Sequence, residues 1–309
     1  MDVRLLDYFL RVAELGSINK AAASLRLSQP ALSRHIALLE HEMGNKLFHR
    51  SQGGVHLTEA GRLLSDRARP LMRQFAILKD QVGQKASGQL AIGTPPAWQQ
   101  VVTSSFVEKL TATCPSIALR IYEGVSNVLR DYMSAGLLDI AIVPHDAPPM
   151  ANYRKSSLVR EHMVLVGQAE EQLNARDPVN LSRLDGLPLV LPGRPNVARI
   201  QVERALESKG MQFRLAVETD TLSLCLDLAR RGVAFTVVPA SSLQGQRSGD
   251  MISWAPVKGL FVTWAFCENV DRMHSQAVRE GRKLFLSEVS DVLSSKNWSG
   301  VERVKGSSV

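Results

Sequence analysis

The sequence predicts an all-α N-terminal domain, then one long helix, then an α/β C-terminal domain. Three observations support this order. The first 45 residues hold three segments with helical spacing of apolar residues, residues 58–84 repeat apolar residues every seven positions, and short β-type runs alternate with helical runs from residue 90 onward. A chain of 309 residues is long enough for two or three such domains.

The stretch Ser24–Glu40 predicts an amphipathic helix. Ser28 is a good N-cap, Pro30 suits the first turn, and no glycine follows before Gly44. Leu32, Ile36 and Leu39 share one apolar face, and the opposite face carries Gln29, Pro30, Ser33, Arg34, Ala37 and His41. Amide, guanidinium and small apolar groups can read base edges in a DNA major groove. The alternative is an ordinary solvated face.

The flanking segments complete a winged helix-turn-helix pattern. One helix should run from Val3 to Leu15 and end at Gly16, and Ser17 should cap a second helix in residues 18–27. Residues 46–58 contain two short strand-like pieces around Gly53 and Gly54, which predicts a hairpin, the wing.

Residues 58–84 predict a long linker helix with a coiled-coil seam. Its apolar residues fall at seven-residue spacing in two rows, Leu64, Leu71 and Leu78 in one and Ala68, Phe75 and Val82 in the other. The seam predicts a dimer, and Pro70 predicts a bend in the helix. The alternative is a helix packed along its own C-terminal domain.

Beyond a short hinge at residues 85–89, alternating elements predict an α/β fold with largely parallel sheets. The expected strands are 90–93, 117–122, 139–143, 163–167, 187–191, 214–217, 233–238, 251–254 and 260–266. The expected helices are 99–112, 126–135, 197–208, 221–230 and 272–293. Two groups of strands indicate two subdomains, with crossovers near Arg160 and Gly259, and the polar tail after Ser294 is expected to be disordered.

Charge favours a polyanionic partner for the N-terminal part. The formal net charge is +7, and residues 1–87 hold 13 Lys and Arg against 8 Asp and Glu. Cys114, Cys225 and Cys267 are far apart without metal-ligand spacing, so neither a disulfide framework nor a metal site is expected. No segment has the roughly 20 apolar residues of a membrane span, and the chain is expected to be cytoplasmic.

Over nearly its whole length the chain resembles the LysR-type transcriptional regulators. The resemblance rests on LDYFLRVAELGSINKAAASLRLSQPALSRHIALLEHEMGNKLFHR (residues 6–50) and VHLTEAG (55–61), with weaker agreement in EGVSNVLRDYMSAGLLDIAIV (123–143) and RRGVAFTVVP (230–239). It implies an all-α winged helix-turn-helix domain with a long linker helix, then an α/β two-lobed effector domain like that of periplasmic binding proteins. Family members usually act as tetramers.

The resemblance also implies domain boundaries and DNA contacts. Residues 1–58 would form the DNA-binding domain, 59–87 the dimerisation helix and 88–309 the effector domain, with lobe I at 88–161 and 264–309 and lobe II at 162–263. The positions facing the major groove would be Ser28, Gln29, Pro30, Ser33 and Arg34. Arg50 and the wing would approach the backbone or minor groove. The family usually has a basic residue in the wing where this chain has Gly53, which weakens that contact or passes it to His56.

The effector is expected in the crevice beyond the carboxyl ends of the strands. Thr94 and Ser126 offer hydroxyls at helix starts, where backbone N–H groups favour an anion, so a carboxylate is expected. Arg194 could pair with it and Trp98 could stack on a ring. The same strand-end loops hold His145, Asn196 and Thr219. The alternatives are that Trp98 fills a core gap, that Arg194 pairs with a surface acid and that His145 is only solvated.

The predicted function is a ligand-responsive, sequence-specific transcription regulator. No catalytic motif occurs, since G-x-S-x-G, a Walker loop and G-x-G-x-x-G are all absent, and no cofactor is expected beyond the small-molecule effector. Expected partners are a double-stranded DNA operator, further copies in a homodimer or homotetramer, and RNA polymerase if the protein activates. The alternatives are a solute-binding module or a DNA-binding protein without ligand control.

Overall fold

A computed structural model describes residues 2–51, 54–82, 88–245, 251–295, 298 and 300–304, without the side chains of residues 50, 51, 73, 74 and 76–82. The chain forms two compact units. One comprises Met1–Gln84 together with Ala135–Leu137, and the other comprises Lys85–Ser134 and Leu138–Val309. Residues 85–87 of the hinge predicted at 85–89 and the turn residue Gly53 lie outside the described residues, and Gln89 of that hinge already begins a strand.

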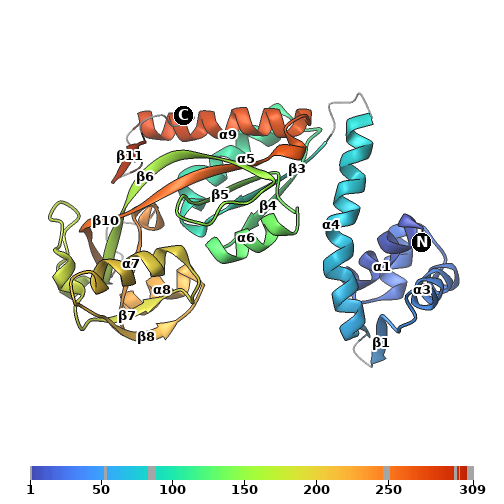
Figure 1. Ribbon diagram of the computed structural model, residues 1–309, viewed down its shortest axis with the longest axis horizontal. Helices are drawn as coiled ribbons and strands as arrows, with labels where there is room; N and C mark the ends of the chain where they lie inside the picture. Colours follow the sequence, from blue (N-terminus) through green and yellow to red (C-terminus); the bar gives the residue numbers. More distant parts are fainter. Residues whose placement is uncertain are drawn as a thin grey trace. The chain divides into compact units, whose positions relative to one another are not determined.

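Three short helices open the first unit (Figure 1): α1 (Val3–Leu15), α2 (Ile18–Leu25) and α3 (Gln29–Met43). Gly16 and Gly44 end α1 and α3 in the left-handed conformation, which glycine adopts without strain. The apolar stripes of the three helices meet around Phe9, Leu32 and Leu39, all fully buried. The predicted helices and their core face are confirmed.

The wing is an antiparallel hairpin of β1 (Phe48–Ser51) and β2 (Gly54–Leu57). Its second strand rests on the α1–α2 turn, where Val55 N donates to Gly16 O at 2.9 Å. A β-carbon on Gly54 would lie 2.7 Å from that same carbonyl oxygen. Gly54 is therefore required by close backbone contact.

The linker helix α4 (Glu59–Val82) is continuous through Pro70. Thr58 caps it, since Gly61 N donates to Thr58 Oγ1 at 3.0 Å, and a β-carbon on Gly61 would collide with the Leu47 carbonyl. Leu64, which the sequence assigned to the dimer seam, packs instead against the core of its own domain beside Ala68. The first turns of the predicted seam thus belong to the core of the first unit.

The second unit contains a mixed sheet. Its described strands are β3 (Gln89–Thr94), β4 (Ala118–Glu123), β5 (Ile140–Pro144), β6 (Tyr153–Gln168), β7 (Pro188–Leu191), β8 (Arg214–Glu218), β9 (Phe235–Pro239), β10 (Ile252–Asn269) and β11 (Val301–Arg303). The order is β4-β3-β5-β10-β6-β9-β7-β8, with β11 beside β6. Parallel pairs occur at both ends of this order, β4-β3-β5 in lobe I and β9-β7-β8 in lobe II.

Two long antiparallel strands, β6 and β10, run through both lobes and join them. The sequence predicted a largely parallel sheet with separate strands at 163–167, 251–254 and 260–266. This prediction is wrong for the centre of the sheet, where two continuous strands pair antiparallel. Charged residues such as Arg160, Glu161 and Lys258 interrupt the apolar pattern and hide the continuity of each strand. The register of the pair shifts between Pro256 and Phe261, close to the crossover predicted at Gly259.

Helices cover both lobes (Figure 1). Lobe I carries α5 (Ser104–Thr113), α6 (Ser126–Ser134) and α9 (Gln276–Ser294), and lobe II carries α7 (Val197–Glu207) and α8 (Leu222–Arg230). The tail expected to be disordered after Ser294 is ordered in part, because β11 pairs with β6 and Trp298 is 3% exposed. No described helix is long and apolar enough to cross a membrane.

Candidate functional site

The outer face of α3 gathers the residues predicted to face DNA. Ser28, Gln29, Pro30 and Arg34 are exposed and Ser33 is half-buried. Ser28 Oγ caps the helix by accepting from Ala31 N at 3.3 Å, and Gln29 Nε2 donates to Ser33 Oγ at 2.9 Å. This face presents a guanidinium, an amide and hydroxyls on a rigid helix.

Glu40 fixes the far end of α3 to the wing. Its Oε1 accepts from Leu47 N at 2.9 Å and Phe48 N at 3.3 Å, and its Oε2 accepts from Lys46 Nζ at 2.7 Å. Burial raises the pKa of Glu40, but the hydrogen bonds from Lys46, Leu47 and Phe48 outweigh burial, so the pKa lies below its ordinary value of 4.5. Sequence reasoning missed this residue because its role depends on the backbone of another element.

The wing presents two histidines. His56 is exposed and lies opposite His49, with ring centroids 5.6 Å apart. The side chain of Arg50 lies outside the described part of the structure, as do those of Leu78 and Val82 in the linker helix. On α4, Leu71 is 58% and Phe75 38% exposed.

A cavity of about 80 Å³ lies between the two lobes of the second unit. Prolines that end strands supply much of its wall: Pro95 and Pro96 after β3, Pro144 at the end of β5, Pro192 after β7 and Pro239 at the end of β9. Because proline has no N–H, these strand ends offer apolar surface in place of backbone donors. Valine, leucine and isoleucine side chains and Trp264 complete a mostly apolar wall.

Three of the predicted effector residues line this cavity: Ser126, Asn196 and Thr219. Ser126 in lobe I accepts from Val197 N in lobe II at 3.1 Å, and Asn196 Oδ1 caps α7 by accepting from Arg199 N at 3.2 Å. The cavity is therefore closed on one side by a direct hydrogen bond between the lobes.

The other four predicted effector residues do not line it. Thr94 is buried within β3, and His145 is exposed outside the cavity. Trp98 is fully buried and packs against Trp264 and Trp298, with ring centroids 5.7 and 4.9 Å away. It serves the core of lobe I, because the chain turns inward at the 3₁₀ turn Pro96–Trp98.

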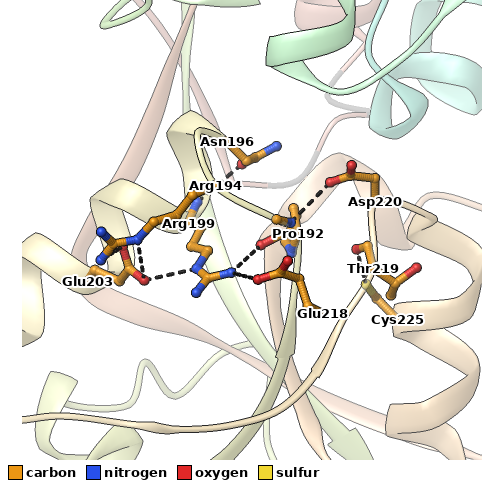
Figure 2. Close-up of polar contacts among 10 residues, drawn as sticks. Pro192, Arg194, Asn196, Arg199, Glu203, Glu218, Thr219, Asp220 and Cys225 are labelled. Atoms are coloured by element: carbon orange, nitrogen blue, oxygen red, sulfur yellow. Dashed lines mark hydrogen bonds and ion pairs between the residues drawn. The ribbon is translucent and has the colours of Figure 1, made fainter.

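Arg194 is also absent from the cavity wall. Its side chain is 64% exposed and pairs with Glu203 at 2.9 Å. Figure 2 shows Arg199 beside it, contacting Glu203, Glu218 and the carbonyl of Pro192. This balanced group of two arginines and two glutamates holds the Pro192–Asn196 loop against α7. The expected pairing of Arg194 with a ligand carboxylate is thus replaced by an internal ion pair.

Asp220, which belongs to a strand-end loop expected at the crevice, also lines the cavity, whereas sequence reasoning did not select Cys225, Ser242 and Trp264. Trp264 Nε1 donates to the buried Glu161 Oε2 at 2.7 Å, and Trp298 Nε1 donates to Glu161 Oε1 at 3.1 Å. The recurring strand-then-proline pattern was the available signal, since it marks the strand ends that surround the crevice.

The two buried cysteines, Cys225 and Cys267, are poorly suited to reactive chemistry. Burial raises the pKa of Cys225 to about 11 and that of Cys267 to about 11, so both are thiols at neutral pH. Among the described residues no cluster of three or more His, Cys, Asp or Glu side chains could hold a metal ion.

Comparison with known proteins agrees with this architecture. Residues 3–62 match the bacterial regulatory helix-turn-helix protein, lysR family, and residues 83–289 match the LysR substrate binding domain. The chain is 30% identical over 258 residues to the nitrogen assimilation regulatory protein nac of Klebsiella aerogenes, covering 81% of this chain and 83% of that protein. It is 28% identical over 311 residues to the HTH-type transcriptional regulator BbuR of Bordetella bronchiseptica, covering 99% and 95%.

Solved structures share the fold. The LysR family transcriptional regulator CbnR superposes with a TM-score of 0.69 at 20% identity over 94% of this chain and 99% of that one. Full-length CbnR complexed with its target DNA gives 0.68 at 21% identity, covering 94% and 100%.

A winged helix-turn-helix followed by a two-lobed domain with an interlobe cavity defines a DNA-binding regulator with an effector-binding domain. The chain belongs to the LysR family of transcriptional regulators. The relatives are regulators of transcription, so the chain is a regulator and not an enzyme.

Replacing Glu40 by Gln should loosen the wing at neutral pH. The variant loses a charge-assisted bond to Lys46 and weakens two backbone bonds, a cost of about 1 kcal/mol. Folding lowers the pKa of Glu40, so its carboxylate adds its full stabilisation of the folded state at any pH above the ordinary pKa. This stabilisation is lost as the pH falls through the pKa of Glu40 in the folded protein. Hydrogen exchange of peptides covering residues 44–58 should therefore differ from wild type at pH 7 and converge in acid.

The exposed Asp7 provides a control, since Asp7→Asn removes one charge from α1 and should leave exchange in the wing unchanged. A Glu40→Gln wing as protected as wild type at pH 7 would contradict the assigned role.

Proposed function

We propose that a small molecule bound between the two lobes controls how this regulator binds a specific DNA operator. The observation that carries the proposal is the interlobe cavity, which is closed on one side by the hydrogen bond from Val197 N to Ser126 Oγ. A ligand that prefers one separation of the lobes shifts the population toward it. RNA polymerase is a further partner if the protein activates transcription.

The DNA contacts proposed for α3 are Ser28, Gln29, Pro30, Ser33 and Arg34, with Arg50 and His56 of the wing near the backbone or minor groove. The exposure of the α3 residues and their rigid placement support this. Gln and Arg side chains fit adenine and guanine edges respectively.

The proposed homodimer forms through the outer surface of α4, and two dimers form a tetramer. Leu71 and Phe75 are exposed apolar side chains one helical turn apart. Such side chains on a long helix favour burial against a second copy.

The organic acid expected from the sequence stays a prediction. Arg194 is already paired with Glu203, and the described lining of the cavity includes no Lys, Arg or His. The cavity therefore supports a binding position for the ligand without supporting a negative charge on it.

Replacing Gln29 or Arg34 by Ala should weaken binding to the cognate operator by about 1–3 kcal/mol and change binding to random DNA little. Fluorescence anisotropy with both DNAs at fixed salt measures the two affinities. Arg11→Ala is the matched control, because Arg11 is an exposed arginine of α1 paired with Glu14. Equal losses on cognate and random DNA would exclude base reading by this face.

Replacing both Leu71 and Phe75 by Glu should release monomers, because charges buried in an apolar seam are strongly unfavourable. Sedimentation velocity reports the oligomeric state. Asp66→Lys changes charge at an exposed position of the same helix and should leave the oligomer intact. An unchanged oligomer in the double variant would place the interface elsewhere.

Filling the cavity should abolish the response to any ligand that binds there. Ala198 lines the cavity from α7, and Ala198→Phe would occupy it with a ring. A compound that raises the melting temperature of the wild type through native-state binding should then give no shift. An equal shift in the variant would place the ligand outside the cavity.

A further inference from the structure

The cavity opens into a groove that carries negative charge. The groove has a volume of about 510 Å³ and shares Pro96, Val125, Asp220 and Ser242 with the cavity wall. Glu123 of lobe I and Asp220 of lobe II both line it. Within the described part of the chain, neither lining includes a Lys, Arg or His. The two carboxylates therefore make the electrostatic potential negative at the mouth of the cavity, where it meets the groove.

Both carboxylates are exposed. Among the described residues, the hydrogen bond that Asp220 accepts at Oδ1 comes from a backbone group, Gly193 N, at 3.1 Å (Figure 2). The two nearby arginines pair with other carboxylates: Arg194 of the Pro192–Asn196 loop with Glu203, and Arg199 of α7 with Glu203 and Glu218. The charge on Asp220 is thus available to a ligand.

Ser242 supplies an independent sign of a ligand at the same place. The residue is 8% exposed, lines both the cavity and the groove, and its Oγ has no hydrogen-bond partner among the described residues. A buried hydroxyl without a hydrogen-bond partner is destabilising, because it has lost water and gained nothing in return. A polar group held where the apolar cavity meets the acidic groove would remove that cost.

We propose that the effector is a small organic cation, with a compact apolar body in the cavity and a protonated amine at the mouth, beside Ser242 and between Glu123 and Asp220. The inference rests on the proposed function, in which the effector binds between the lobes. An ammonium group has three donors and no acceptor, which suits two carboxylates and a hydroxyl. A carboxylate ligand would instead meet two like charges there, which works against its binding.

The cavity also limits the buried part of the ligand. Its volume of about 80 Å³ is roughly half the 150 Å³ of an apolar cavity that holds benzene. A branched alkyl group of a few carbons therefore fits the cavity, and the amine and any further polar groups extend into the groove.

The test compares three probes that carry the same isobutyl group on different polar groups: isobutylamine, isobutanol and isovalerate. Titration calorimetry on the full-length protein at low ionic strength should show the amine binding about 10-fold tighter than the alcohol, and the acid weakest. Raising the salt concentration should weaken amine binding and leave alcohol binding unchanged, because salt screens exposed charges.

Asp220→Asn and Glu123→Gln should each weaken amine binding about 5-fold to 10-fold and change alcohol binding less than about twofold. Asn keeps an oxygen that can accept from Gly193 N, so the loop is preserved. Glu207→Gln is the matched control, since Glu207 is an exposed carboxylate at the end of α7 outside both linings.

Three outcomes would overturn the cationic ligand: tightest binding of the acid, equal binding of all three probes, or amine binding unaffected by both variants. If Ala198→Phe still blocks the probe that binds, the cavity remains the effector site and only its charge preference is wrong. If no probe binds, or if Ala198→Phe leaves binding unchanged, the proposed position of the effector fails as well.

Discussion

The antiparallel pairing of β6 with β10 is the constraint on which the effector domain depends. Both strands pass through both lobes. The parallel strands of lobe I pair with β10 through β5, and those of lobe II pair with β6 through β9. This arrangement directs the carboxyl ends of β3, β5, β7 and β9 at one crevice, where ligands bind in folds of this class. The register shift between Pro256 and Phe261 makes β10 irregular between the two lobes. Any movement of one lobe relative to the other requires β10 to bend there.

The N-terminal unit depends on backbone contacts that only particular residues permit. Gly54 approaches the Gly16 carbonyl, Gly61 approaches the Leu47 carbonyl, and Glu40 accepts two wing N–H groups. Together they connect the α1–α2 turn, the wing and the linker helix to α3. The orientation of α3 is therefore coupled to the start of α4 by short-range contacts and does not depend on flexible loops.

Local patterns in the sequence were sufficient for the α-helices and for the short strands β3, β4, β5, β7, β8 and β9. Caps such as Ser28 and stops such as Gly16 and Gly44 act within a few residues, so α1 and α3 followed from spacing alone. The continuity of β6 and β10, the buried Trp98 and the pairing of Arg194 with Glu203 depend on residues distant in sequence. Ser126, Asn196 and Thr219, which were predicted to bind the effector, line the cavity because strand-end loops converge in this fold. Ser242 follows a proline-ended strand whose loop was not predicted to reach the crevice.

The hydrogen bonds around Glu161 give the molecule a built-in optical reporter. Of the four tryptophans, Trp264 forms part of the cavity wall, Trp298 shares its carboxylate partner, and Trp98 lies against both rings. Indole emission depends on the polarity and hydrogen bonding of the ring's surroundings. A ligand that displaces the ring of Trp264 alters the environment of this indole cluster, so the intrinsic fluorescence of the unlabelled protein can follow occupancy of the cavity in solution.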